Sequence, residues 1–422
     1  MHIAYLFDRP LPAKETDSEQ ALKTIAALAR RGLRVSLIVP AVSPATSLGT
    51  SAVASPQLPN LALTQKLKSY YQLEGDFETY AVPNSYPRWS TPRKWQHARR
   101  ALEVAQQLKP DVLYTRNFPT LFRLAKQPLP FAYETYRPWA DQFPVLRPSF
   151  RSALGKGHCL GAVLHSQFAA SRYAAWGIDE AKLSVVWNGY DPKYFAQRPS
   201  LQEARNELGL AQDRPLVVYT GHINATKGLD MVVALAQRCP NVDFLLVGSE
   251  GNGLIERMSR RYGNIKTVPW QPFDRTVSYL FAANVLLLPP SRIPLRVIGN
   301  TVLPMKLFLY LAAGRPILAP RAPDTRELLR DESEPDGNAL LVAPGDASGA
   351  ADALQRLVTE RTLADRLSNA ALATSQGLTW DARAEKIEQF LTRRLREGAP
   401  STALGTGPSG AGGTGPTGAG RA

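Results

Sequence analysis

Cysteine is scarce in this chain of 422 residues, because only Cys159 and Cys239 occur. Two cysteines cannot build a disulfide framework, and no metal-ligand spacing surrounds them. The sequence also lacks an uninterrupted apolar run of about 18 residues, so we expect no transmembrane helix. Residues 1–8 have the pattern of a strand and lack the basic start and long apolar segment of a signal peptide. These absences predict a cytoplasmic protein without a metal.

Positive charge is plentiful and unevenly spread. The net charge is +14, and residues 1–195 contribute +10 of it, with 24 Lys and Arg against 14 Asp and Glu. A basic first half attracts acidic partners, such as nucleic acid or an anionic membrane surface that carries a lipid-phosphate acceptor. A basic surface without any partner is the alternative. The basic residues are not interleaved with aromatic residues as in nucleic-acid readers, so we expect no nucleic acid as a partner.

The length and the hydrophobic pattern predict two α/β domains. A strand at 2–7, a helix at 18–31 and a strand at 35–39 form a parallel βαβ start. The predicted units are a first domain at 1–195, a linker at about 192–213, a second domain at 214–378, a helix at 379–397 that crosses back to the first domain, and a tail at 398–422. The tail contains mainly Gly, Ala, Thr, Pro and Ser, and we expect it to be disordered.

The second domain repeats the alternation of strands and helices. The expected strands are 216–220, 243–247, 265–268, 285–288 and 316–319, and the expected helices are 229–238, 253–262, 275–283, 304–313, 346–358 and 362–372. The segment from Val217 to Asp230 reads as a strand, a turn with Gly221 and Lys227, and a helix that Gly228 opens. A doubly wound sheet commonly binds phosphate at such a turn. It is not a Walker loop, because no Gly-Lys-Ser/Thr follows four spacer residues.

A second phosphate-binding element is predicted where a loop meets the helix at 304–313. The free backbone amides of Thr301, Val302 and Leu303 would meet a diphosphate at the positive end of the helix dipole. Pro304 suits an early helical position, where its missing N–H costs little. Lys306 adds a positive charge to the same segment. A tight join between loop and helix that binds nothing is the alternative.

Three segments resemble the family 4 glycosyltransferases. These are the turn at Gly221 to Gly228, which resembles Gly-Arg-Leu-x-x-x-Lys-Gly, the segment Trp187-Asn-Gly-Tyr-Asp191, and the block Leu303-Pro-Met-Lys-Leu-Phe-Leu-Tyr-Leu-Ala-Ala-Gly-Arg-Pro-Ile317. The resemblance implies the GT-B fold, in which two Rossmann-like domains face each other across a cleft. It also implies retaining transfer of a sugar from a nucleotide-diphosphate sugar, without a metal or other cofactor. The acceptor would be a glycan or lipid-linked molecule, in surface polysaccharide or glycoconjugate synthesis at the inner face of the membrane.

The resemblance assigns roles to several residues. Lys227 would neutralise the leaving diphosphate, although a solvated loop lysine is the alternative. His222 stands where the family has arginine, and would either donate to the diphosphate or cap the turn beside Gly221. Asn188 and Gly189 would lie at the interdomain cleft or form a plain turn. Glu327 matches the glutamate of a Gly-Gly-x-x-Glu run and would contact the donor or cap a helix.

Departures from the family pattern fall on polar positions. Leu309 and Thr301 stand where relatives carry glutamates that bind the ribose and approach the sugar, and leucine cannot accept a hydrogen bond. Tyr136 replaces a histidine close to the donor sugar and is a poor base near neutral pH. Glu134 remains, either to position the acceptor or as a structural carboxylate. These departures favour the alternative of a GT-B protein that has lost catalysis and serves as a binding or scaffold subunit.

Two further segments enter the prediction. The loop from Asp8 to Glu19 has no glycine, so its backbone is a weaker candidate for diphosphate binding, and Lys14 or Thr16 would contact the acceptor instead. His165 and Ser166 follow a strand, but the sequence places no acidic partner beside them, so we expect no hydrolase triad. A sugar-nucleotide epimerase of the same architecture would need acid and base groups of which no clear set is visible.

Overall fold

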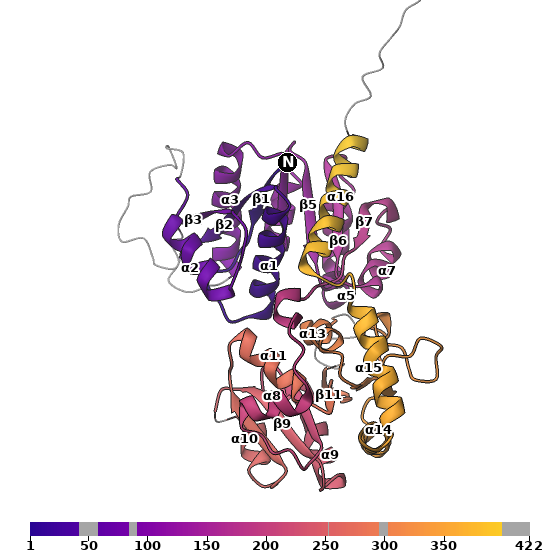
Figure 1. The fold of residues 1–422 in the computed structure, drawn as a ribbon. Helices are drawn as coiled ribbons and strands as arrows, with labels where there is room; N and C mark the ends of the chain where they lie inside the picture. Colours follow the sequence, from indigo (N-terminus) through magenta and orange to yellow (C-terminus); the bar gives the residue numbers. More distant parts are fainter. Residues whose placement is uncertain (42–57, 84–90, 252, 295–302, 399–422) are drawn as a thin grey trace, which may run out of the picture.

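The computed structural model describes residues 1–41, 58–83, 91–251, 253–294 and 303–398. They form two lobes, one above the other in Figure 1, and each lobe is built on one parallel β-sheet. The predicted α/β architecture of two Rossmann-like domains is therefore confirmed. The tail beyond Gly398, for which we predicted disorder, lies outside the described residues.

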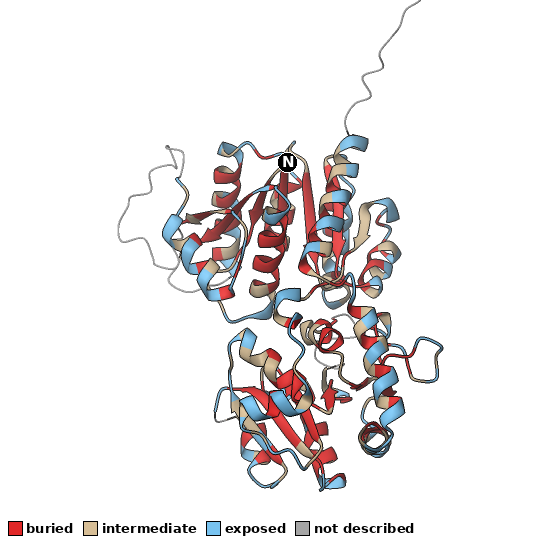
Figure 2. Cartoon of the chain, viewed as in Figure 1, coloured by how far each residue is buried: buried red, intermediate tan, exposed pale blue. Residues whose placement is uncertain are grey.

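The first lobe contains a seven-stranded sheet in the order β3-β2-β1-β4-β5-β6-β7. Its strands are β1 (His2–Leu6), β2 (Arg34–Pro40), β3 (Glu78–Val82), β4 (Val112–Thr115), β5 (Phe131–Thr135), β6 (Cys159–Leu164) and β7 (Leu183–Val185). Its helices are α1 (Thr16–Arg30), α2 (Leu61–Tyr71), α3 (Thr91–Gln107), α4 (Phe118–Leu124), α5 (Trp139–Gln142), η1 (Pro144–Leu146), α6 (Arg147–Leu154), α7 (Gln167–Ala175) and η2 (Glu180–Lys182). Strands such as β5 and β6 are buried on both faces, as Figure 2 shows, because helices cover both sides of a parallel sheet.

The second lobe contains a six-stranded parallel sheet in the order β10-β9-β8-β11-β12-β13. Its strands are β8 (Leu216–Thr220), β9 (Asp243–Ser249), β10 (Ile265–Pro269), β11 (Val285–Leu287), β12 (Ile317–Pro320) and β13 (Leu340–Val342). Its helical segments are η3 (Pro192–Phe195), α8 (Leu201–Leu208), η4 (Ala225–Lys227), α9 (Asp230–Arg238), α10 (Leu254–Ser259), α11 (Phe273–Phe281), α13 (Met305–Ala313), η5 (Thr325–Glu327), α14 (Ala347–Thr359) and α15 (Arg361–Ser375). The strand order reverses between β8 and β11, as it does between β1 and β4 in the first lobe.

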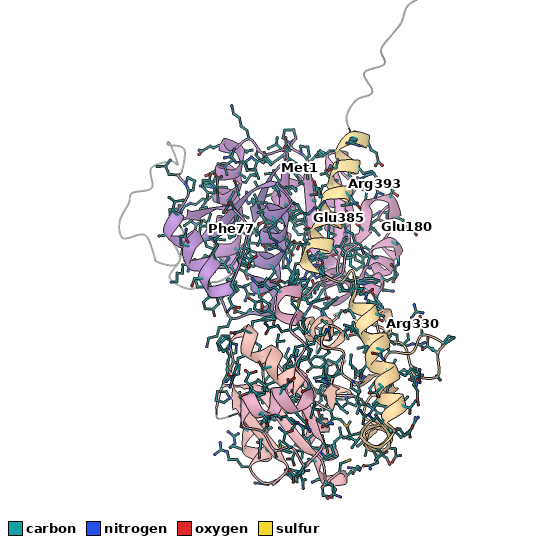
Figure 3. The ribbon with its side chains drawn as sticks, in the orientation of Figure 1. Met1, Phe77, Glu180, Arg330, Glu385 and Arg393 are labelled. Carbon is teal, nitrogen blue, oxygen red and sulfur yellow. The ribbon has the colours of Figure 1, made fainter. Side chains whose placement is uncertain are left out.

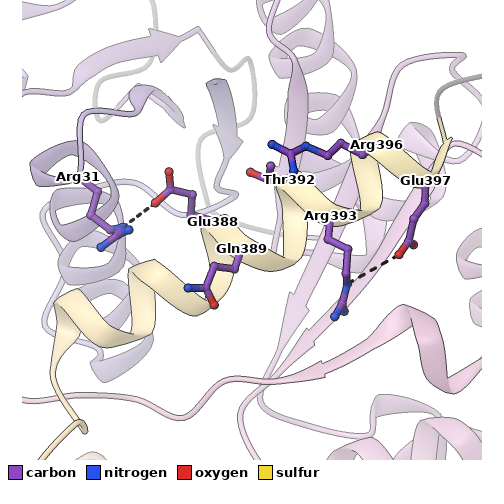
Figure 4. Close-up of a pocket in the computed structure, with 7 residues that line it drawn as sticks. All are labelled: Arg31, Glu388, Gln389, Thr392, Arg393, Arg396 and Glu397. Carbon is purple, nitrogen blue, oxygen red and sulfur yellow. Dashed lines mark hydrogen bonds and ion pairs between the residues drawn. The ribbon is translucent and has the colours of Figure 1, made fainter.

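The last helix, α16 (Trp380–Gly398), packs on the first lobe beside α1 and β6 (Figure 1). Trp380, Ile387 and Phe390 are buried there in the core that α1 and β1 share. The opposite face of α16 carries exposed residues, among them Glu385 and Arg393, which Figure 3 labels. A shallow surface pocket follows the seam, where Arg31 at the end of α1 pairs with a glutamate of α16 (Figure 4).

The chain passes between the lobes twice, and the two crossings lie against each other. Tyr190 and Thr379 form a parallel β-bridge. A Cβ atom added to Gly189 would lie 2.4 Å from the carbonyl carbon of Thr379, so no larger residue fits there. Gly189 is therefore fixed by the close approach of the second crossing.

Several elements differ from the prediction. The predicted linker contains α8, which begins with a capping box formed by Ser200 and Glu203. The strand β13 was missed because it has only three residues, and the helix α2 was missed because its apolar residues are weakly periodic. Gly228 does not open a helix, because it has φ of +74° and α9 begins only at Asp230. Pro304 is the N-cap residue of α13 and not a residue of its first turn.

Candidate active site

A cavity of about 610 Å³ lies between the two lobes. Its walls come from segments that follow β1, β5 and β6 in the first lobe and β8 to β12 in the second. Parallel sheets bind ligands at the carboxyl ends of their strands, near the point where the strand order reverses. The cavity occupies that position in both lobes at once, and the predicted cleft residues Asn188 and Gly189 line it.

The turn after β8 brings backbone close to the cavity. Gly221 has φ of +122°, and a Cβ atom there would lie 3.1 Å from Nζ of Lys306. Gly248, near the end of β9, packs so tightly that a Cβ atom there would lie 2.5 Å from the carbonyl oxygen of Gly221. His222 is half-buried in the cavity wall, with Nδ1 3.9 Å from Oε1 of Glu250. Two glycines thus give this wall the close backbone approach that a phosphate site needs.

Lys227 ends η4 and lines the cavity, half-buried. The turn that carries it is held by the Asn224 side chain, which accepts a hydrogen bond from the backbone N–H of Thr226 at 3.0 Å. Burial, and next the charge of Arg137, lower the pKa of Lys227. No carboxylate among the described residues forms an ion pair with it. Lys227 is therefore a cation that faces the cavity without a counter-charge.

Lys306 lies in the first turn of α13 and lines the cavity directly beside the turn after β8. Its Nζ stands 3.5 Å from the centre of the Tyr219 ring, a cation–π contact. Burial, and next the charge of Lys227, hold the pKa of Lys306 well below its usual value. Within the described part of the chain it has no carboxylate partner either. The charge of Lys227 therefore destabilises the charged form of Lys306.

Arg137 supplies a third cation, from the other lobe, and the sequence analysis missed it. It follows β5, lines the cavity, and its guanidinium carbon lies 5.2 Å from the ring centre of Tyr136 and 5.4 Å from that of Trp139. Its Nε is buried and has no hydrogen-bond partner among the described residues. Like charges gathered without a counter-charge raise the free energy of the unliganded protein. These three basic side chains therefore indicate a site for a multiply charged anion. Arg137 could have been found from the sequence, because it directly follows the predicted site residue Tyr136.

The start of α13 completes this part of the cavity as far as the structure describes it. Thr301 and Val302, whose amides we predicted as phosphate donors, lie outside the described residues. Leu303 lines the cavity, although its own surface is only 3% exposed. Leu309 also lines the cavity and packs partly against the core of the second lobe. The helix that carries the predicted donor site therefore borders the cleft, with leucine where a polar acceptor was expected from the family.

Glu134 does not reach the cavity, which corrects its prediction as a catalytic or acceptor-positioning residue. Its side chain is 0% exposed, and Oε1 accepts hydrogen bonds from Arg383 at 2.7 Å and lies 2.7 Å from Nε2 of His165. Tyr114 donates to Oε2 at 2.8 Å, and Arg116 lies 3.7 Å away. Burial alone would raise the pKa of Glu134, but the Arg383 and Arg116 guanidiniums lower it well below the usual range. The alternative of a structural carboxylate therefore fits the structure.

The contact between Glu134 and His165 was not predicted, because the sequence showed no acidic partner for His165. Glu134 is that partner, contributed by the neighbouring strand. Burial, and next the charge of Arg383, lower the pKa of His165 to about 3, so the imidazole is neutral near pH 7. His165 lines the cavity, with the Tyr136 ring 6.3 Å away, and Gln20 lies 2.8 Å from its Nδ1. Tyr136 lines the cavity as well, and its proximity to a donor sugar stays a prediction.

Gln20 connects several polar residues of this wall by hydrogen bonds, and it was not predicted from the sequence. Its amide contacts the side chains of His165 and Asn188, and its oxygen accepts from Arg116 at 2.5 Å. Lys14 and Thr16, the residues predicted to meet the acceptor, line the cavity on the same side as Gln20. The loop after β1 and the start of α1 therefore form one wall of the cavity.

Glu327 makes a contact between the lobes, which corrects its prediction as a donor-binding residue. Its two oxygens accept hydrogen bonds from the backbone N–H groups of Gln167 and Phe168, both at 2.8 Å, and Trp187 Nε1 donates to it at 3.2 Å. Glu327 therefore caps the N-terminus of α7 in the first lobe, where a negative charge is stabilising. The alternative of a capping carboxylate therefore fits the structure, whereas Glu327 does not line the cavity where a donor contact would place it.

Each of the two lobes matches a known family of glycosyltransferases. The family model described as "Glycosyltransferase Family 4" matches residues 19–194, and that described as "Glycosyl transferases group 1" matches residues 201–374. The chain belongs to glycosyltransferase family 4. The two models divide this family 4 chain at the point where the structure passes from the first lobe to the second.

Relatives of this family 4 chain agree with the assignment at moderate identity. It is 28% identical over 177 residues to the lipopolysaccharide core biosynthesis glycosyltransferase LpsE of Rhizobium meliloti, covering 41% of this chain and 48% of that one. It is 26% identical over 238 residues to a D-inositol 3-phosphate glycosyltransferase of Nocardia farcinica, covering 53% of this chain and 50% of that one. The chain thus matches about half the length of these curated relatives.

Solved structures share the fold over almost the whole family 4 chain. A glycosyltransferase of Rickettsia africae superposes with a TM-score of 0.69 at 14% identity, covering 94% of this chain and 98% of that one. Anabaena HepE in complex with UDP gives 0.67 at 16% identity, covering 93% and 100%. These matches establish the GT-B fold.

The described residues contain neither a cluster of metal ligands nor a helix suited to span a membrane. No three His, Cys, Asp or Glu residues in that part of the chain come together as metal ligands. None of the helices that the structure describes combines the length and the apolar character that a membrane span requires.

Proposed function

We propose that this protein transfers a sugar from a nucleotide-diphosphate sugar to a glycan or lipid-linked acceptor, with retention at the anomeric carbon. The observation that carries the proposal is the group of Lys227, Lys306 and Arg137 at the cavity, without carboxylate partners among the described residues. A nucleoside diphosphate brings the negative charge that such a group lacks. The retained stereochemistry rests on the family resemblance.

In this mechanism the protein acts mainly by electrostatic stabilisation. As the bond between sugar and phosphate breaks, negative charge grows on the diphosphate. Lys227 and Arg137, together with Lys306 after the bound diphosphate has raised its pKa, are positioned to stabilise that charge. The same three side chains would take the role that a divalent metal has in other transferases, so we propose that no metal is needed. His165 is neutral and held by Glu134, so it offers a fixed polar edge to the ligand.

The acceptor would enter over the first lobe. That lobe carries most of the net positive charge, and Phe143 and Val145 are exposed beside Arg147. Apolar side chains next to cations suit an anionic membrane surface. We therefore propose a cytoplasmic enzyme that works at the inner face of the membrane. Synthesis of a surface polysaccharide or glycoconjugate is the proposed setting, as the name of LpsE suggests for that relative.

The proposal predicts that a nucleoside diphosphate stabilises the folded protein. A ligand at 100 times its dissociation constant adds about 2.7 kcal/mol. We expect at least one of UDP, GDP and ADP at millimolar concentration to raise the melting temperature, and its sugar conjugates to be hydrolysed or transferred in the presence of EDTA. Adenine or guanine without phosphate is the control. The absence of a shift with all three diphosphates would favour the scaffold alternative, which Leu309 and the inaccessible Glu134 support.

Proton uptake gives a second prediction, specific for Lys306. Burial and Lys227 favour its neutral form in the free protein, whereas a bound diphosphate favours the ammonium form and raises the pKa. Affinity should therefore be constant below the pKa of Lys306 in the free protein and fall as the pH rises above it. Calorimetry in buffers of different ionisation enthalpy should show proton uptake at pH 8 that Lys306→Arg, which stays charged, reduces. Equal uptake by both proteins would contradict this role.

A further inference from the structure

One oxygen of a cavity carboxylate has no hydrogen-bond partner among the described residues. Asp324 follows β12, lines the cavity, and is 9% exposed. Its Oδ1 is buried and has no hydrogen-bond partner among the described residues. Two other carboxylates of the cavity lie near cations, since Asp17 pairs with Arg9 at 3.2 Å and Asp191 lies 4.0 Å from Lys23. For the third, Glu19, burial raises the pKa and the charge of Lys23 opposes that rise. A buried acceptor without a partner destabilises the protein, so a ligand that donates hydrogen bonds to this carboxylate would be favoured there.

The position of Asp324 along the cavity wall indicates which part of the ligand it meets. The wall of the second lobe follows the strand order, with Trp270 after β10 at one end, Gly221 and Lys227 after β8 in the middle, and Asp324 after β12 at the other end. The Trp270 side chain is 63% exposed and offers a flat apolar surface to a nucleobase. The cations hold the diphosphate in the middle. In this arrangement the sugar, which is attached to the diphosphate on the side opposite the nucleoside, reaches Asp324.

Asp324 is also fixed in place beside the junction of the lobes. Glu327, three residues later, is bonded to the backbone of α7, which begins two residues after His165. The loop between β12 and η5 therefore cannot easily turn its carboxylate away. Burial raises the pKa of Asp324 to about 6, although the backbone N–H groups of Thr325 and of Asp324 itself lower it, and Glu327 adds the smallest contribution, which raises it. Near pH 7 it is mostly an ionised acceptor.

We propose that Asp324 determines donor specificity by accepting hydrogen bonds from hydroxyl groups of the sugar carried on the diphosphate. This inference rests on the proposed function. Asp324 would then supply, from a different loop, the hydrogen-bond acceptor that relatives have as glutamates at the positions of Leu309 and Thr301. A neutral, hydroxyl-rich sugar fits this carboxylate, whereas an acidic sugar would be repelled by it.

The test separates the sugar from the nucleotide. Dissociation constants for UDP, GDP and ADP and for their glucose conjugates are measured by calorimetry with the wild type, Asp324→Ala, Asp324→Asn and the surface control Asp365→Ala. We expect Asp324→Ala to bind the preferred diphosphate within about twofold of the wild type and the sugar conjugate at least tenfold more weakly. Asp324→Asn, which keeps one oxygen acceptor, should fall between the two.

Each outcome of these measurements either supports or contradicts the inference. Unchanged diphosphate binding shows that Asp324→Ala is folded, so a selective loss of sugar-nucleotide affinity supports the inference. Equal weakening of both ligands, or of neither, would overturn it while leaving the proposed function intact. Failure of the wild type to bind any diphosphate would overturn the proposed function and this inference together. A preference of the wild type for UDP-glucuronate over UDP-glucose would also contradict the inference.

Discussion

Replacement of Lys227 by alanine should lower kcat/KM for sugar transfer by about 100-fold to 1,000-fold, the usual effect of removing one preorganised donor to developing negative charge. Lys227 lines the cavity, has no described carboxylate partner, and lies close enough to Arg137 for that charge to lower its pKa. Its charge is therefore free to act on the ligand. Steady-state kinetics with the nucleotide sugar found in the screen give the measurement.

Lys266→Ala is the matched control for Lys227→Ala. Lys266 is an exposed lysine of β10 in the same lobe and does not line the cavity. It should leave kcat/KM within twofold. A Lys227→Ala protein that retains more than a third of wild-type kcat/KM would show that Lys227 is a solvated loop lysine. A loss shared equally by the control would point to a general effect of net charge.

Replacement of Arg383 by methionine should have the largest effect on stability. Its side chain is 0% exposed and donates to Glu134 at 2.7 Å, to the carbonyl oxygens of Val186 and Trp187 at 2.6 and 2.9 Å, and to Thr24 at 3.0 Å. Removing one partner of a buried charge network costs about 3–5 kcal/mol, because the other charge stays buried. For a lobe of this size we expect the melting temperature to fall by about 10 °C.

The comparison for Arg383→Met is Arg393→Ala, on the exposed side of the same helix. Arg393 lies 3.9 Å from Glu397 and is exposed, so its loss should change the melting temperature by less than 2 °C. Differential scanning calorimetry measures both. A shift for Arg383→Met as small as that of the control would mean that α16 does not hold the first lobe through this network.

The fold could be predicted from the sequence because most of its strands are short buried apolar runs that alternate with regular helices. The predicted strand at 216–220 and the predicted helix at 304–313 differ from β8 and α13 by at most one residue. The elements that were missed depend on other information. The helix α8 is set by a capping box within a polar linker, and β13 is three residues long and is defined by pairing with β12.

The site could be predicted only where its chemistry is local in the sequence. Gly221 and Lys227 belong to one turn, so their spacing sufficed. Glu134 shows the limit, because the residues that bury and neutralise it, Arg116 and Arg383, are 18 and 249 positions away. Glu327 likewise bonds a helix some 160 residues earlier in the chain. Pairings between segments this distant leave no pattern in a single sequence.

A crystal structure with a bound nucleoside diphosphate tests the central claim most directly. The account predicts that the diphosphate lies between the lobes, within hydrogen-bond distance of Lys227 and Lys306 and facing Arg137. A diphosphate bound elsewhere, or bound in the cleft with these three side chains turned away from it, would contradict the account.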